Sequence, residues 1–337
     1  MLLNEYGLND KDKWLIMPDN NVEPNIYQNL IDKYYNEGYK RINQGHYMRW
    51  EDYHDNVAAQ NHVLDISYLR GINNLEAFWL WATNVDLSYV QNLNSNCLEF
   101  LALGFRHKSM GQFKKSNKID LSFVTKFNNL KHLFLGPDVV SPIKIIGATF
   151  PALLELTMHY DDISKVNFEC FPKLQSLQIR SKDDGIEKYK LEQLVNLREL
   201  SISGFPKSQN LDFLSDFENL EILNISGFVN ITKFPDLSRL TKLKWLFLNC
   251  KGIKNFESLA SVPNLEKIKI SNRISKDFDV ELFRPITESN SLKEFGYVYD
   301  YQTKSEERKL IEMFGDRYNP MSYQIFLLES GGYHIIK

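Results

Sequence analysis

One short pattern recurs along most of this chain. Leucine or isoleucine occupies the first, fourth and sixth positions of LRELSIS, LEILNIS, LKWLFLN and LEKIKIS. Candidate copies of the pattern begin at ten places: Leu75, Leu98, Leu130, Leu153, Leu174, Leu197, Leu220, Leu243, Leu265 and Leu292. Successive starts are 23, 32, 23, 21, 23, 23, 23, 22 and 27 residues apart. Composition alone does not produce so regular a series, so we predict a repeat protein in which each unit packs on its neighbours.

Each copy of the pattern predicts a strand, because alternate side chains of a strand point to opposite faces. The fourth and sixth positions are expected to face a core shared by stacked units. The third, fifth and seventh positions are expected to face out of a parallel sheet. Between the patterns, segments such as ITKFPDLSRLTKL and IKNFESLASVPNL carry apolar residues every three or four positions, which predicts a short helical or 3₁₀ return.

The spacing and the pattern together resemble the leucine-rich-repeat family, in particular its internalin-like class of about 22 residues per unit. The resemblance covers about residues 64 to 298. It implies an α/β solenoid, a curved horseshoe with a parallel sheet on the concave face and short returns on the convex face. The asparagine that this family carries at its ninth position is replaced here by residues such as Thr83, Asp161 and Lys251. The buried asparagine ladder of the family is therefore not expected.

The two ends of a solenoid need caps, because a bare terminal unit exposes its leucines and an unpaired strand. We predict an N-terminal cap, partly helical, in residues 1–62, repeats in 63–298 and a C-terminal cap in 299–337. The first cap has a helical stripe of Ile26, Leu30, Ile31, Tyr34 and Tyr35. In the second cap, SEERKLIEMFGDRY predicts a helix with Ser305 as N-cap and an apolar side of Leu310, Ile311 and Phe314, followed by YQIFLLES as an extra strand.

Two groups of aromatic residues fall at outward positions and are candidate partner-binding anchors. The first group is Trp79, Trp81, Phe100 and Phe134, and the second is Trp245 and Phe247 with Lys267 and Lys269 beside them. His159 and Arg180 belong to a polar stretch between the groups. Two alternatives for the first group are burial of Trp79 and Trp81 under the N-terminal cap and a register slip of one residue. The basic stretch RHKSMGQFKK, residues 106–115, is either a second binding surface or a solvated loop.

Catalytic and metal-binding motifs are absent from the sequence, and the seven histidines show no metal-ligand spacing. His46 and His54 lie near Glu51 and Asp52, but neighbours in sequence do not make a converging site. We therefore predict no enzymatic activity, no cofactor and no metal. A net charge of −3 argues against nucleic acid as a partner, and no apolar run of about 18 residues suggests a membrane helix. Three scattered cysteines and an N-terminus without a signal-peptide pattern favour the cytoplasm.

The family resemblance implies that the concave face binds a protein. A stand-alone cytosolic member looks like the immunity proteins that neutralise secreted bacterial toxins, and this is the specific function that we predict, with a monomeric state favoured. The abundance of asparagine and lysine is compatible with a bacterial source. A scaffold or regulatory subunit of a cellular enzyme is the alternative, and an enzyme built from cap residues is the third hypothesis.

Overall fold

All ten copies of the repeat pattern form strands, and each strand begins two residues after the first leucine of its copy. Their bounds are β4 Ala77–Ala82, β5 Phe100–Phe105, β6 His132–Leu135, β7 Glu155–His159, β8 Ser176–Arg180, β9 Glu199–Ser203, β10 Ile222–Ser226, β11 Trp245–Asn249, β12 Lys267–Ser271 and β13 Glu294–Val298. The ten initial leucines are at most 4% exposed. The register predicted from the sequence is therefore confirmed.

The structure is a computed structural model of the chain. It describes residues 8–9, 14–17, 24–35, 37–45, 66–82, 86, 88–94, 96–105, 122–136, 149–159, 166–180, 185–249, 252–271, 279–298 and 303–320. The chain divides into two compact units. Unit 1 comprises residues 1–160 and 165–173, and unit 2 comprises residues 161–164 and 174–337.

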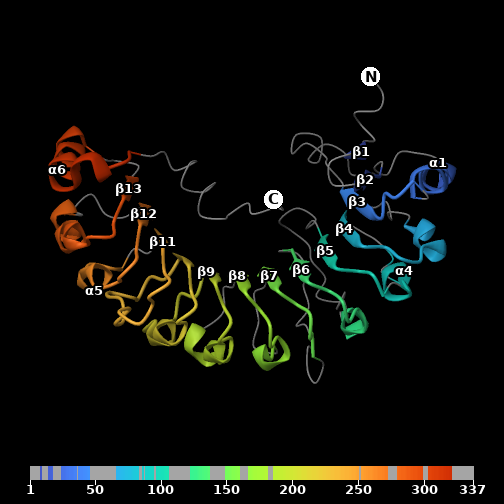
Figure 1. Cartoon of the computed structure of the whole chain (residues 1–337), viewed down its shortest axis with the longest axis horizontal. Helices are drawn as coiled ribbons and strands as arrows, with labels where there is room; N and C mark the ends of the chain where they lie inside the picture. Colours follow the sequence, from blue (N-terminus) through green and yellow to red (C-terminus); the bar gives the residue numbers. More distant parts are fainter. Residues whose placement is uncertain are drawn as a thin grey trace, which may run out of the picture. The chain divides into compact units, whose positions relative to one another are not determined.

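In unit 1 the strands pair in chain order from β1 to β7 (Figure 1). Two short strands, β2 (Trp14–Ile16) and β3 (Arg41–Gly45), join the parallel sheet before the first predicted repeat. A further strand, β1 (Leu8–Asn9), pairs antiparallel with β2. The parallel sheet thus begins inside the segment that the sequence assigns to the N-terminal cap.

Helical segments in unit 1 connect successive strands. Their bounds are α1 Pro24–Leu30, the π-helical η2 Ile31–Tyr35, η3 Ser67–Gly71, α4 Ser88–Gln91, η4 Ser122–Lys126 and η5 Phe168–Cys170. Tyr27 of α1 stacks on Tyr68 of η3 with ring centroids 5.6 Å apart, and the Tyr35 hydroxyl donates to the Asn73 carbonyl. Burial raises the pKa of Tyr35 to about 12. Of the predicted helical stripe, Ile31 and Tyr35 are buried, while Ile26, Leu30 and Tyr34 are only partly buried. Tyr27, which was not part of the predicted stripe, is buried as well.

In unit 2 the strands β8 to β13 are parallel and follow chain order, and the returns run along one side of this sheet (Figure 1). ITKFPDLSRLTKL, residues 231–243, was predicted to be a helical or 3₁₀ return, but it forms turns and one isolated bridge, from Lys233 to Asn255, and no helix. The other returns of unit 2 are the predicted short helical or 3₁₀ turns. Their bounds are η6 Ile186–Lys188, η7 Leu191–Gln193, η8 Asp212–Asp216, α5 Glu257–Ala260 and η9 Val280–Glu288. Side chains at the fourth and sixth positions of the repeat pattern, such as Leu223 and Ile225, are 0% exposed and form the core with phenylalanines from the returns.

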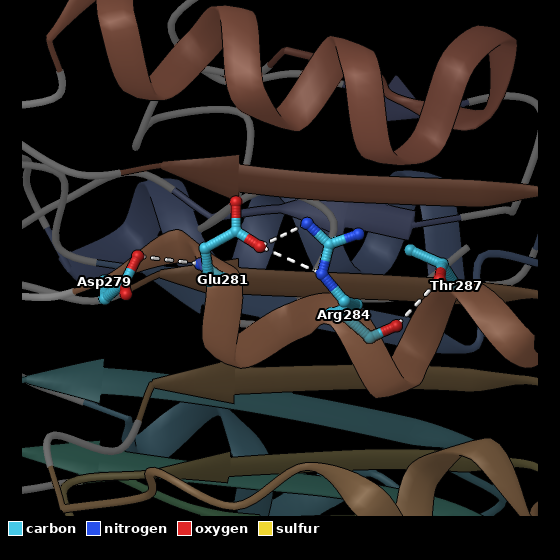
Figure 2. A network of polar contacts seen from close by, with 4 residues as sticks. All are labelled: Asp279, Glu281, Arg284 and Thr287. Atoms are coloured by element: carbon cyan, nitrogen blue, oxygen red, sulfur yellow. Dashed lines mark hydrogen bonds and ion pairs between the residues drawn. The ribbon is translucent and has the colours of Figure 1, made fainter.

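A polar network fixes the return η9. The Asp279 carboxylate accepts a hydrogen bond from the Glu281 amide at 3.0 Å, and Arg284 Nε donates to Glu281 Oε2 at 2.9 Å (Figure 2). The Thr287 hydroxyl donates to the Arg284 carbonyl at 2.7 Å. These contacts satisfy polar groups of the helix itself, as expected of a capped helix end. We assign this network to stability, because every partner lies on the same short segment.

The C-terminal cap docks on the last strand. Helix α6 (Lys304–Phe314) and η10 (Gly315–Arg317) form it, and the Phe314 ring stacks on Phe295 with centroids 3.9 Å apart. The Arg317 guanidinium donates to the carbonyls of Ser289 and Thr287 at 3.3 and 3.2 Å. Leu310 and Phe314 are buried as predicted. Ile311, which was predicted to share their apolar side, is 52% exposed. The segment YQIFLLES lies outside the described residues.

The N-cap of α6 is Thr303, so the prediction of Ser305 is wrong. The Thr303 hydroxyl accepts from the Glu306 amide at 3.2 Å, and the Glu306 carboxylate accepts from the Thr303 amide at 2.7 Å. This reciprocal pair is a capping box, which requires Glu or Gln three residues after the cap. Thr303 meets this requirement, whereas Arg308 follows Ser305 at that spacing.

Replacing Thr303 with alanine is expected to lower the free energy of unfolding by about 1 kcal/mol, because the Glu306 amide loses the hydroxyl that accepts its hydrogen bond and the Glu306 carboxylate loses one of its donors. Denaturant titration with hydrogen exchange across α6 measures the loss. Ser305→Ala is the matched control and is expected to leave the midpoint unchanged. An equal loss in the two variants would contradict the assignment of the cap.

Candidate functional site

The face of the sheet opposite the core carries the side chains at the third and fifth positions of the repeat pattern, which are the first and third residues of each strand, and we call it the outward face. Parallel pairing in register aligns these positions in rows across each unit. Adjacent members of a row are about 4.8 Å apart, the spacing of neighbouring strands. The outward face is therefore where the predicted anchors can act together.

In unit 1 the structure brings three predicted anchors together. The Trp79 ring lies 6.2 Å from Phe100 and 6.5 Å from Phe134, measured between centroids, and all three residues are partly buried. Trp14 of β2, which sequence analysis missed, stands edge-on to Phe100 at 5.9 Å and is 9% exposed. The side chain of Trp81 lies outside the described residues. We call Trp14, Trp79, Phe100 and Phe134 the aromatic patch.

Polar groups adjoin the aromatic patch. His132 Nδ1 lies 2.9 Å from Glu155 Oε2, and the imidazole ring lies 6.2 Å from Phe100. Asn43 is in register with Trp79 on the neighbouring strand β3. Its buried Oδ1 is the one side-chain oxygen or nitrogen of the described residues that is buried without a hydrogen-bond partner.

In unit 2 the second predicted group is only partly exposed. Trp245 is 42% exposed, as expected of a side chain on the outward face. Phe247 is 2% exposed and Lys269 is 0% exposed, so the expectation that these two side chains are exposed is wrong. Alternation fixes the face on which a side chain leaves the strand, but not how far other residues cover it. Phe247 lies in register between Asn224 and Lys269 on the neighbouring strands.

A cluster of charges adjoins Trp245. The Lys267 ammonium lies 5.6 Å from the Trp245 ring centroid and 3.1 Å from Glu294 Oε2. Glu294 Oε1 lies 2.5 Å from Lys269 Nζ and accepts from Asn319 Nδ2 at 2.7 Å. Burial opposes ionisation of Glu294, but the hydrogen bonds from Lys269, Asn319 and Lys267 outweigh it and hold the pKa of this carboxyl below its ordinary value. Two lysines therefore share one ionised carboxylate.

The remaining predicted positions are less informative. Arg180 is exposed at the end of β8. His159 ends β7, and its side chain lies outside the described residues, as do the basic stretch 106–115, His46 and His54. In the described part of the chain, no three His, Cys, Asp or Glu side chains gather in a way that could hold a metal ion. Within the same ranges, no helix has the length and apolar character needed to cross a membrane.

Sequence analysis missed two ladders that join the repeats. Asparagines directly before the first leucine donate to a carbonyl of the preceding repeat, as in Asn219 to Val195 at 3.0 Å and Asn264 to Thr241 at 2.7 Å. At the second position, opposite charges pair between repeats, as in Arg198 with Glu221 at 2.7 Å. The asparagine that recurs directly before the first leucine of a repeat could have been used to predict the first ladder. Both ladders belong to repeat stacking and leave the outward face to other residues.

No protein-family model and no curated protein matches the chain. Similar solved structures include the internalin InlF of Listeria monocytogenes, at 18% identity over 77% of this chain and 66% of that one, with a TM-score of 0.41. Internalin C2 of the same species has 22% identity over 55% and 78% of the two chains and a TM-score of 0.39. A leucine-rich-repeat protein of Leptospira interrogans has 13% identity over 76% and 70%, with a TM-score of 0.38.

The strand at every repeat pattern, the parallel pairing of these strands in chain order and the short helical returns that follow most of them decide the fold class. The fold is a leucine-rich-repeat solenoid. The chain spans just under two thirds of the InlF chain, so we take no activity from that protein. What the solenoid binds has to be inferred from its own outward face.

Proposed function

We propose that this solenoid is a non-catalytic protein-binding module that binds through its outward face. The observation that carries the proposal is the exposure of Trp245, which is 42% exposed on the repeat strand β11. Exposed tryptophans are enriched among the residues that dominate protein interfaces. Val195, Val229 and Ile311 are also exposed, but none of them lies on a strand.

As the specific role, we propose a cytoplasmic immunity protein that binds and neutralises a secreted bacterial toxin domain. The family resemblance in the sequence supports this role, as does an outward face that combines aromatic anchors with charges. Aromatic anchors supply affinity in such interfaces, and charges select the partner. The solenoid would act by covering the active site of the toxin or by blocking its assembly.

The proposed contacts follow from burial. Trp79, Phe100, Phe134, Trp245 and Lys267 are at least partly exposed on the outward face and are proposed to touch the partner. Arg180 is retained as an exposed contact at a strand end. Because Phe247 and Lys269 are buried, we propose that they support Trp245 and Glu294.

Site-specific photo-crosslinking tests the proposal. A photoreactive phenylalanine analogue replaces Trp245 in the full chain, and the same analogue replaces Val195, which is 59% exposed outside the strands, as the matched control. We expect position 245 to capture a discrete protein from host lysate, identified by mass spectrometry, and position 195 to capture none. Capture of the same proteins at equal yield from both positions would contradict the proposal.

The immunity role needs a second measurement. Expression of the captured protein alone is expected to stop bacterial growth, and co-expression of the solenoid is expected to restore it. Capture of a housekeeping enzyme whose expression is harmless would contradict the immunity role. The protein-binding proposal would survive that result, with a scaffold or regulatory subunit as the role.

A further inference from the structure

The residues at the third position of the repeat pattern in unit 2 form a row in which acidic, apolar and basic side chains follow one another. Glu199, Ile222, Trp245 and Lys267 lie in register on β9, β10, β11 and β12. The row therefore reads acid, apolar, apolar, base across four neighbouring strands, and we call it the bipolar row. A partner that fits this surface has to match both ends of the row as well as its middle.

The middle of the bipolar row is accessible. Trp245 is 42% exposed and Ile222 beside it is partly buried. A single apolar side chain of a partner can cover the two together, because neighbouring strands are only about 4.8 Å apart. Burial of a tryptophan face of this kind is a common source of binding energy in protein interfaces.

The basic end of the row is Lys267, with 22% of its side chain exposed. Its ammonium lies 3.1 Å from Glu294, but this carboxylate also serves Lys269 at 2.5 Å and Asn319 at 2.7 Å. An ammonium has three N–H donors, so Lys267 can bind a second carboxylate while it keeps Glu294.

The acidic end of the row is Glu199. It is exposed on β9, and the Ser176 hydroxyl donates to its Oε2 at a long 3.4 Å. A neutral hydroxyl does not compensate the charge of this carboxylate. Glu199 therefore favours a cation in a partner, whereas Lys267 favours an anion.

We propose that the bipolar row binds an extended segment of a partner protein with a basic, an apolar and an acidic side chain in that order from β9 to β12. Three strand spacings separate Glu199 from Lys267, or about 14 Å. In an extended chain, residues i, i+2 and i+4 lie on one face and span about 13 Å. The segment is thus of the type Lys-x-Phe-x-Glu. This inference rests on the proposed function and adds the chemistry of the partner.

Four synthetic peptides in an otherwise identical neutral sequence test the inference. They carry Lys-x-Phe-x-Glu, Lys-x-Phe-x-Lys, Glu-x-Phe-x-Glu or Lys-x-Ser-x-Glu, and their affinities for the immobilised full chain are measured by surface plasmon resonance. The first peptide is expected to bind about 2- to 5-fold tighter than either peptide with one sign of charge, the range of exposed ion pairs. The serine peptide is expected to lose roughly tenfold or more, as is Trp245→Ala.

Charge reversals in the protein give a sharper readout. Because Lys267→Glu makes both ends of the row acidic, this variant is expected to prefer the Lys-x-Phe-x-Lys peptide. The milder Lys267→Gln is expected only to lose the preference for the mixed peptide, Lys-x-Phe-x-Glu. The double variant Glu199→Lys with Lys267→Glu is expected to prefer the mixed peptide again, because the peptide can bind end for end. Lys293→Glu is the matched control, since Lys293 is 71% exposed and pairs with Glu266 outside the row.

The outcomes separate the two proposals. Equal affinities of the three phenylalanine peptides, or preferences that do not follow the charge reversals, would overturn the bipolar row. If photo-crosslinking at position 245 still captures a partner, the protein-binding proposal survives that result. Charge preferences that follow the reversals in the expected order, with no change in Lys293→Glu, support the inference.

Discussion

Replacing Phe283 with alanine is expected to lower the free energy of unfolding by about 3–5 kcal/mol, the usual cost of removing a buried phenylalanine ring. Phe283 is 0% exposed in the return η9. Its ring centroid lies 5.1 Å from Phe256, 5.2 Å from Phe295 and 5.1 Å from Tyr297. The variant therefore leaves a cavity lined by three other aromatic rings, and these rigid side chains cannot move in to fill it.

The loss is expected to act first on the C-terminal repeats. In a solenoid, each unit is stabilised by its nearest neighbours, so a cavity under β13 weakens its attachment to β12 and the docking of α6. Hydrogen exchange resolved by segment, together with denaturant titration, measures this effect. Phe283→Leu retains much of the volume and is expected to cost less, while exposed Val195→Ala is expected to change stability by less than about 0.5 kcal/mol. A loss below about 1 kcal/mol in Phe283→Ala would contradict the packing argument.

The strands of the repeats could be predicted from the sequence because one local pattern specifies both their position and their direction. Leu220, Leu223 and Ile225 show this in one unit, since all three are 0% exposed and their spacing puts them on the core side of β10. The two parallel strands before the first repeat, β2 and β3, lack this pattern. In β3 only Ile42 is a buried apolar residue, and Gln44 takes the place of a core leucine.

Gln44 also shows why β3 could not be found from its sequence. Its side chain is 0% exposed, and its Oε1 accepts a hydrogen bond from the Tyr68 hydroxyl at 2.9 Å. A buried amide is tolerated only where such a partner exists, and that partner comes from a return 24 residues later. The strand therefore depends on a contact that no local sequence pattern predicts. Because β2, which pairs with β3, was not predicted either, the position of Trp14 in the aromatic patch could not be predicted.

The sequence predicted the face of the sheet on which the candidate side chains lie, but not how far these side chains are exposed. The register put Trp245, Phe247 and Lys269 on the outward face, yet only Trp245 is exposed. How far a side chain is covered depends on residues from other repeats, whose contributions a single strand does not encode. The α6 cap differs, because the Thr303 and Glu306 spacing was present in the sequence and the capping-box rule identifies it.

Replacing Gly252 with alanine is expected to lower the free energy of unfolding by about 2–3 kcal/mol, as is typical when an extra carbon is forced into a packed site. An added Cβ would lie inside the contact distance of the Ile231 carbonyl oxygen and 2.8 Å from the Val229 carbonyl oxygen. Both obstacles are backbone atoms of the preceding repeat. They cannot rotate away as a side chain can, so two repeats have to separate to make room.

Gly71→Ala is the matched control for this variant, because a Cβ at Gly71 meets no atom within 4 Å. Its stability is expected to stay within about 0.5 kcal/mol of the wild type, or to rise slightly as the unfolded chain loses freedom. Denaturant midpoints of the two variants, with hydrogen exchange of β10 and β11, measure the difference. Equal midpoints would show that the repeats do not approach each other this closely at Gly252. A loss of stability confined to Gly252→Ala would support a close backbone contact between two repeats beside β11, the strand that carries Trp245.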